Sequence, residues 1–340
     1  MKLKLLALAA AGVMAGAVSA QSANVTLYGV VDTFIANERA GASAGKAAVS
    51  STVVEAGGLS GSRWGLRGTE SLGGGLNAVF AIEAGINSDV GTSAQGGRTY
   101  GRQVFVGLNG GFGSFTMGRQ YSALFSVLCE VDIDGCSTFS AVGNHYIGLP
   151  GALRIDNSLL YTTPNMGGLT AAVMYAAGEQ TTTSAGRHLS ANAQYKAGPL
   201  YAALGYADVK NATGTASAGR TWIAAGGFDA GVAKLTASYL ENKYAFGAAK
   251  FKGTQLGAAV PFGATTLILN AGQGKAGAVK QTLFNVGVDH SLSKRTTAYA
   301  RYANADNNAA SNLGAFTGKP AVTGLGSDKR IIAVGIRHRF

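Results

Sequence analysis

Two groups of charged side chains have the types and spacing that could do chemistry. Four arginines stand in or beside apolar segments: Arg63, Arg67, Arg102 and Arg154. Three carboxylates lie between two cysteines: Glu130, Asp132 and Asp134, between Cys129 and Cys136. Guanidinium groups and carboxylates form charge-assisted contacts and steer ions of opposite charge. Both groups could steer charged solutes, or they could be the ordinary polar side chains of a lumen.

The sequence gives little support to catalysis or to a bound metal. The four histidines are His145, His188, His290 and His338, and none stands in a spacing such as His-Glu-x-x-His. No Gly-x-Ser-x-Gly elbow occurs, and the two cysteines have no matched histidine nearby. We expect no enzyme, no metal and no cofactor. A hydrolase whose site is assembled in space on a barrel stays open as an alternative.

Composition narrows the class of protein. The 340 residues include 51 glycines, are 47% hydrophobic and are only 13% charged. A chain this apolar is not disordered, and it lacks the strict glycine period of collagen. Its 28 basic and 17 acidic residues show few aromatic-basic clusters, so we expect no nucleic-acid partner. The basicity suits an anion path or a negatively charged surface.

The first twenty residues predict export. Lys2 and Lys4 precede the apolar residues 5–17, and Val18-Ser19-Ala20 forms a small-residue cleavage site. We expect residues 1–20 to be a cleaved signal peptide, which lowers the formal charge from +11 to +9. Residues 21–340 contain no apolar run long enough to span a membrane as a helix. The protein is then periplasmic, secreted or an outer-membrane barrel.

A period of two residues runs along most of the chain. Phe284, Val286 and Val288 alternate with polar or small residues, and Ile332, Val334 and Ile336 do the same. Turn signals alternate between short connections and longer polar ones. Counting between them gives sixteen strands of about 10 residues, the length that crosses a bilayer at a tilt. The prediction is an all-β, sixteen-stranded antiparallel transmembrane barrel with short periplasmic turns and long extracellular loops. A soluble β-sandwich is the alternative, but it has seven to nine strands.

Several stretches resemble general diffusion porins of the Gram-negative outer membrane, of the β-proteobacterial type. They are Val25-Thr-Leu-Tyr-Gly-Val-Val-Asp32, Ser62-Arg-Trp-Gly-Leu-Arg-Gly-Thr-Glu-Ser-Leu-Gly73, Val106-Gly-Leu-Asn109, Met117-Gly-Arg-Gln120, Asp156-Asn-Ser158 and the terminal Phe340. The resemblance implies a trimer of sixteen-stranded barrels in which the third long loop folds inward. Residues 121–153 would be this constriction loop, and Arg63, Arg102 and Arg154 would match the family's constriction arginines. Similar porins generally lack the cysteine pair.

The strand pleat supports part of this assignment. Arg63 and Arg67 share one face, opposite Trp64 and Leu66. The same counting places Arg154, Asp156 and Ser158 on one face, and Arg102 on the face opposite Gln103 and Phe105. Arg98 and Arg119 are reserve candidates, although Arg119 has the parity of Phe115 and Met117. We expect Cys129 and Cys136 to be bridged, since exported proteins meet an oxidising environment.

The predicted function is passive diffusion of small hydrophilic solutes and ions, through a waist where wall arginines face the loop acids. Such charges bias a pore, and the net charge favours anions, although the loop acids would offset it locally. Expected partners are two further copies of the chain, outer-membrane lipid and lipopolysaccharide, and the assembly machinery, through the strand that ends at Phe340. A plugged adhesion barrel is the alternative from another class, with residues 38–57 and 306–327 as its binding loops.

Overall fold

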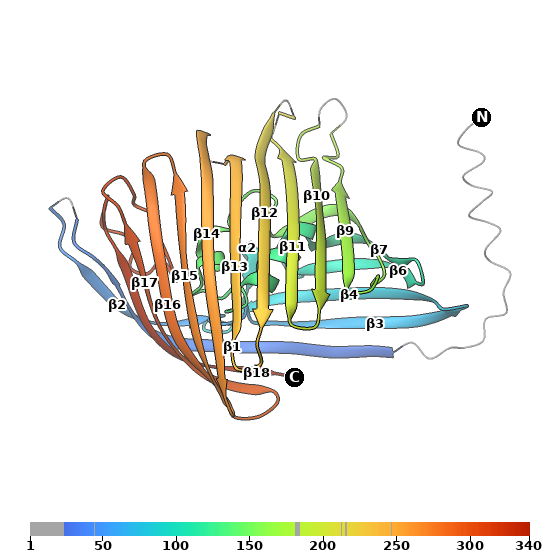
Figure 1. The fold of residues 1–340 in the computed structure, drawn as a ribbon, viewed down its shortest axis with the longest axis horizontal. Helices are drawn as coiled ribbons and strands as arrows, with labels where there is room; N and C mark the ends of the chain where they lie inside the picture. Colours follow the sequence, from blue (N-terminus) through green and yellow to red (C-terminus); the bar gives the residue numbers. More distant parts are fainter. Residues whose placement is uncertain (1–23, 44, 181–183, 212, 215, 246) are drawn as a thin grey trace.

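The structure, a computed structural model, describes residues 24–340 except residues 44, 181–183, 212, 215 and 246. The expected signal peptide, residues 1–20, lies outside the described residues. Strands dominate the described part (Figure 1). No helix in it is long and apolar enough to cross a membrane.

The strands follow one another with antiparallel pairing in a single eighteen-membered sheet. They are β1 (Asn24–Ala40), β2 (Val49–Ala56), β3 (Arg63–Gly73), β4 (Leu76–Asn87), β5 (Thr92–Ser93), β6 (Gln103–Gly110), β7 (Gly113–Tyr121), β8 (Arg154–Thr162), β9 (Leu169–Ala176), β10 (His188–Ala197), β11 (Leu200–Lys210), β12 (Ser217–Asp229), β13 (Lys234–Tyr244), β14 (Gly247–Phe262), β15 (Thr265–Ala276), β16 (Val279–Ser291), β17 (Thr296–Asn307) and β18 (Lys329–Arg339). Short helices in the connections are α2 (Ala94–Gly97), α3 (Ala123–Val131) and α4 (Ala141–His145).

Two details of pairing convert the eighteen strands into sixteen barrel strands. One half of β1 pairs with β3 and the other half with β2, so β2 and β3 form a single wall strand interrupted at residues 57–62. The two-residue β5 pairs only with β4 in the described part of the chain. The interruption is held by Asp32, whose carboxylate accepts hydrogen bonds from the backbone of Leu59 and Ser60 and from the Tyr299 hydroxyl. The predicted sixteen-stranded antiparallel barrel is confirmed.

The barrel closes where its first and last strands meet. β1 pairs with β18 from Val30 opposite Arg339 to Ala40 opposite Lys329. Beyond the last strand residue, Gly29 and Phe340 exchange two backbone hydrogen bonds. Closure removes the two sheet edges, which could not satisfy their backbone groups inside a bilayer.

Alternation along the strands separates an outer from an inner face. On β18, Ile332, Val334 and Ile336 are exposed on the outside, whereas Ile331 and Ala333, which alternate with them, are buried. The alternation that the sequence predicted is therefore present. One connection is shorter than expected: within residues 38–57, β1 extends to Ala40 and β2 begins at Val49, because the alternating pattern continues through both strands.

Residues 122–153 fold inside the barrel. The Ser122 side chain caps α3 by accepting a hydrogen bond from the Phe125 amide, and α3 then packs against β10, β11 and β12. The buried faces of the segment, including Leu124, Leu128 and Tyr146, contact inward apolar side chains such as Ile223 and Leu240. Where this segment covers it, the inner wall of β11–β14 carries apolar side chains such as Ala203, Ile223 and Leu240.

Glycines on the inner wall admit the segment. A Cβ atom at Gly253 would lie 2.2 Å from the Tyr146 ring, and one at Gly272 would lie 2.4 Å from the Ala141 Cβ. A side chain at either position would require a shift of the inner segment or of the wall beside it.

Candidate functional site

Three of the four arginines selected from the sequence surround one buried carboxylate and one tyrosine. Glu83, on β4, accepts a hydrogen bond from Arg102 Nε at 2.6 Å and lies 3.5 Å from Arg63 Nε. Its other oxygen also accepts a hydrogen bond from the Tyr28 hydroxyl at 3.0 Å. Glu83 therefore fixes the positions of two guanidinium groups from separate wall segments.

Tyr121 links the second pair of arginines. Its hydroxyl accepts hydrogen bonds from Arg102 Nη2 and Arg154 Nη2, each at 2.6 Å. The Arg154 guanidinium also lies 4.5 Å from the centre of the Tyr121 ring, and that ring stacks on Phe125 of α3. The first turn of the inner segment is thus joined to the arginines of the wall. We call Arg63, Arg102 and Arg154 the arginine cluster.

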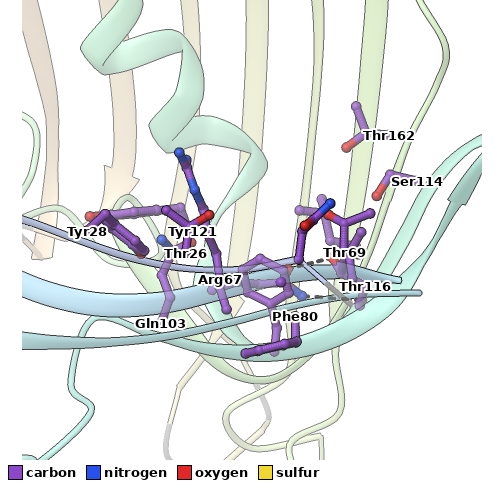
Figure 2. A pocket seen from close by; sticks show the side chains of 17 residues that line it. Thr26, Tyr28, Arg67, Thr69, Phe80, Gln103, Ser114, Thr116, Tyr121 and Thr162 are labelled. Atoms are coloured by element: carbon purple, nitrogen blue, oxygen red, sulfur yellow. Dashed lines mark hydrogen bonds between the residues drawn. The ribbon is translucent and has the colours of Figure 1, made fainter. Parts of the chain in front are cut away.

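Arg67 lines a cavity next to the cluster. Its guanidinium lies 5.2 Å from the centre of the Tyr28 ring. The cavity has a volume of about 710 Å³, and Figure 2 shows Tyr28, Arg67, Gln103 and Tyr121 gathered on one side of it. Ser114 and Thr162 lie on the other side. Hydroxyl, amide and guanidinium groups line it together with apolar side chains such as Phe80 and Phe105, so the cavity offers polar contacts to a hydrated solute.

The pleat prediction was correct on β3 and wrong beside β6. Gln103 and Phe105 line the cavity, although they were expected to face away from it. Arg102 reaches Glu83 from a position before the strand begins, with its backbone amide bonded to the Glu83 carbonyl. Because Arg102 is not a strand residue, the alternation of β6 does not determine its direction.

A bulge turns Asp156 to the face opposite to the one expected. The pairing of β7 with β8 shifts register between Gly118 and Gln120, and Asn157 adopts a φ of +54°. Ser158 is buried, whereas Asp156 is exposed and forms ion pairs with Arg98 and Arg119 at 3.0 and 2.5 Å. The two reserve arginines, Arg98 and Arg119, thus pair with Asp156 and are not part of the arginine cluster.

The loop acids were expected to face the arginine cluster, but they contact other parts of the wall. Glu130 pairs with Lys196 of β10 at 2.9 Å, and Asp134 pairs with the fully buried Arg301 of β17 at 2.7 Å. Asp132 accepts a hydrogen bond from Asn270 of β15. Asp132 and Asp134 are buried against the wall that the inner segment covers, whereas the pair of Glu130 and Lys196 stays partly exposed.

Cys129 and Cys136 form a disulfide in the structure, with their Cα atoms 5.2 Å apart. Inside the loop that they close, Asp132 accepts hydrogen bonds from the backbone amides of Asp134 and Cys136. Burial and the neighbouring Asp134 carboxylate raise the pKa of Asp132 to about 7. This turn is therefore a compact, covalently closed support for the acids that anchor the segment.

The sequence reasoning missed a second set of inward charges. Arg301 pairs with both Asp134 and Asp289, and a cavity of about 280 Å³ beside them is lined by Arg337 and Arg339. The signal was present on β18, since Arg337 and Arg339 alternate with the outward Ile336. Arg301 could be found by the same parity on β17, where it shares a face with the buried Tyr299 and Ala303.

Comparison with known proteins decides the family. The model of the Gram-negative porin family matches residues 7–310 of the chain. The chain belongs to the Gram-negative porin family. It is 36% identical over 360 residues to outer membrane porin protein 32 of Delftia acidovorans and 30% identical over 401 residues to an outer membrane porin of Bordetella pertussis, with full coverage of both partners in each case.

Solved structures agree with this assignment. An anion-selective porin from Comamonas acidovorans superposes with a TM-score of 0.80 and 31% identity, covering 94% of this chain and all of that one. The trimer form of OmpT from Vibrio cholerae has a TM-score of 0.67 at 16% identity, with 94% of this chain and all of that one covered, which shows the fold alone. This porin is an outer-membrane β-barrel channel and not an enzyme.

Proposed function

We propose that this porin passes small hydrophilic solutes and ions by passive diffusion, prefers anions and uses the arginine cluster as its charge filter. The observation that carries the proposal is the local charge balance. Arg63 and Arg102 pair with Glu83, and Arg154 joins them through the Tyr121 hydroxyl, so three guanidinium groups gather around one carboxylate among the described residues. An excess of positive charge at a narrow, wetted passage attracts anions and repels cations.

The contacts of the loop acids also favour a preference for anions. Glu130 and Asp134 are paired with the cations Lys196 and Arg301, and Asp132 is turned toward Asn270, so we expect these acids to offset the arginine cluster little. The similarity to an anion-selective porin from Comamonas acidovorans is consistent with this preference.

Residues 121–153 would act as the constriction loop. Tyr121 at their start contacts Arg102 and Arg154, and α3 covers the opposite inner wall. The passage is then confined to the side lined by β1, β3, β4, β6, β7 and β8. No cofactor is required, because the driving force is the gradient of the solute itself.

We also propose that the channel works as a homotrimer after removal of residues 1–20, and that the strand ending at Phe340 is read by the assembly machinery. A trimer form is known for OmpT of Vibrio cholerae, which has the same fold. The exposed Phe340 at the seam between β1 and β18 supports the assembly role, since the barrel closes where its first and last strands pair.

Swelling of liposomes that contain the purified porin tests this function. We expect influx of a small neutral sugar, faster influx of a small anionic sugar acid of similar size, and slower influx of an amino sugar cation. Equal rates for the anion and the cation would contradict the charge filter. No swelling by folded, inserted protein would contradict a diffusion channel and favour a plugged adhesion barrel.

A further inference from the structure

A row of three lysines lies on the outer face of the barrel. Lys252 on β14 is directly opposite Lys275 on β15, and Lys275 is directly opposite Lys280 on β16. They point outward, because they share the parity of the exposed Leu256, Leu269 and Phe284. Neighbouring strands are about 4.8 Å apart, so the three ammonium groups fall within about 10 Å of one another. We call these residues the lysine row.

Like charges directly opposite in a sheet destabilise it, and here the acids nearby do not compensate. Glu241 lies opposite Lys252, but its carboxylate pairs with Lys250 at 3.1 Å. Asp306 on β17 lies opposite Thr282, which is two residues from Lys280 on β16, and accepts a hydrogen bond from Asn304. Among the described residues, no ion pair involves the lysine row. An anion from outside the chain would relieve this repulsion.

The surface next to the lysine row changes from polar to apolar along the strands. The adjacent row is Thr254, Gln273 and Thr282, and the row after that is Leu256, Ala271 and Phe284. This is the gradient from the headgroup layer to the hydrocarbon layer of a membrane. The lysine row therefore lies at headgroup depth.

An outer groove begins at the polar row and continues into the apolar band. Ala237 and Ala271 form its low floor, and Tyr239 and Leu256 also line it, in a hollow of about 700 Å³. A second hollow of about 650 Å³ continues along Leu235 and Leu269. The groove has the shape and chemistry that an acyl chain requires.

The lysine row belongs to the end of the barrel that carries the long connections. The β15–β16 turn after Lys275 lies at the same end as the β9–β10 connection (Figure 1). In a porin this end faces the cell exterior, where the outer leaflet of a Gram-negative outer membrane presents glycolipid with phosphate groups on its sugars. Three cations side by side match more than one phosphate better than the single phosphate of a glycerophospholipid.

We propose that the lysine row binds the sugar phosphates of one outer-leaflet glycolipid, with an acyl chain of that lipid lying in the groove over Ala237 and Ala271. The site depends on the outer-membrane location and on the orientation of the barrel. It does not depend on the anion preference of the pore, since the lysine row faces away from the lumen.

Native mass spectrometry of the detergent-purified porin, incubated with bisphosphorylated lipid A, tests the site. We expect the wild type to retain the lipid and the variant Lys252→Gln/Lys275→Gln/Lys280→Gln to retain about tenfold less. A control of equal charge, Lys46→Gln/Lys234→Gln/Lys294→Gln, should bind as the wild type does, because these lysines lie elsewhere on the chain. Equal retention by both triple variants would overturn the proposal.

Two further arms make the result specific. Phosphatidylglycerol at the same concentration should be retained less than lipid A, and equal retention would overturn the glycolipid assignment. Ala271→Phe, which fills the groove without changing charge, should also weaken retention, and no change would overturn the acyl-chain placement. The single variant Lys275→Gln provides the same comparison should the triple variant fold poorly, and planar-bilayer conductance should stay at the wild-type value in each variant.

Discussion

Replacement of two cluster arginines should reduce the anion preference by an amount that can be worked from their placement. Arg102 and Arg154 both donate to the Tyr121 hydroxyl, so their guanidinium groups lie close together and an ion passing one also passes the other. In water, an ion about 7 Å from one unit charge gains about 0.6 kcal/mol. Screening at 0.1 M salt halves this to about 0.3 kcal/mol.

For the variant Arg102→Gln/Arg154→Gln, the loss is then about 0.6 kcal/mol for an anion, and a cation gains the same amount. Each change is a factor of about 2.7, so the chloride-to-potassium permeability ratio should fall about sevenfold. The assay is the reversal potential of purified protein in a planar bilayer under a KCl gradient.

The matched control is Arg102→Lys/Arg154→Lys, which keeps both charges and removes the forked guanidinium geometry. It should retain most of the selectivity. An unchanged reversal potential in the glutamine variant, with open-channel conductance preserved, would refute the role of the arginine cluster.

The remaining predictions concern the inner segment. Nonreduced protein should contain no alkylatable thiol when unfolded, and labelling of Cys129 and Cys136 by iodoacetamide would contradict the disulfide. Asp134→Asn should destabilise the barrel by about 3 kcal/mol in thermal unfolding, because it removes one partner of the buried Arg301. The double variant Asp134→Asn/Arg301→Met should recover part of the lost stability. An equal loss in the single and the double variant would contradict the pairing. Because the pKa of Asp132 is raised to about 7, the folded protein holds a proton that the unfolded chain releases between about pH 4 and 7. The free energy of unfolding should therefore fall as the pH rises through this range. Asp132→Asn should flatten this slope, and identical slopes in the variant and the wild type would contradict the raised pKa.

The fold was predictable because its signal is local. Each wall strand repeats an alternation such as that of Ile332, Val334 and Ile336, and turns separate the strands. The direction of Arg63 followed from the same alternation, since it begins β3 and the strand continues without a bulge to Arg67. Where the backbone is regular, a count of two residues is sufficient to place a side chain.

The rest depended on features that are not local. Arg102 lies just before a strand, so counting from it gave the wrong face for Gln103 and Phe105. Asp156 lies in a bulge, so counting gave the wrong face for Asp156 itself. The partners of Glu130 and Asp134 come from β10 and β17, which are far away in the chain. A sequence shows that carboxylates are present in a loop, but long-range packing decides which wall they contact.

The most direct test of the account is the sign of the reversal potential of the wild-type porin in a planar bilayer under a tenfold KCl gradient. The account predicts a potential displaced toward the equilibrium potential of chloride, because the arginine cluster carries more positive charge than Glu83 offsets. A potential displaced toward that of potassium would contradict it.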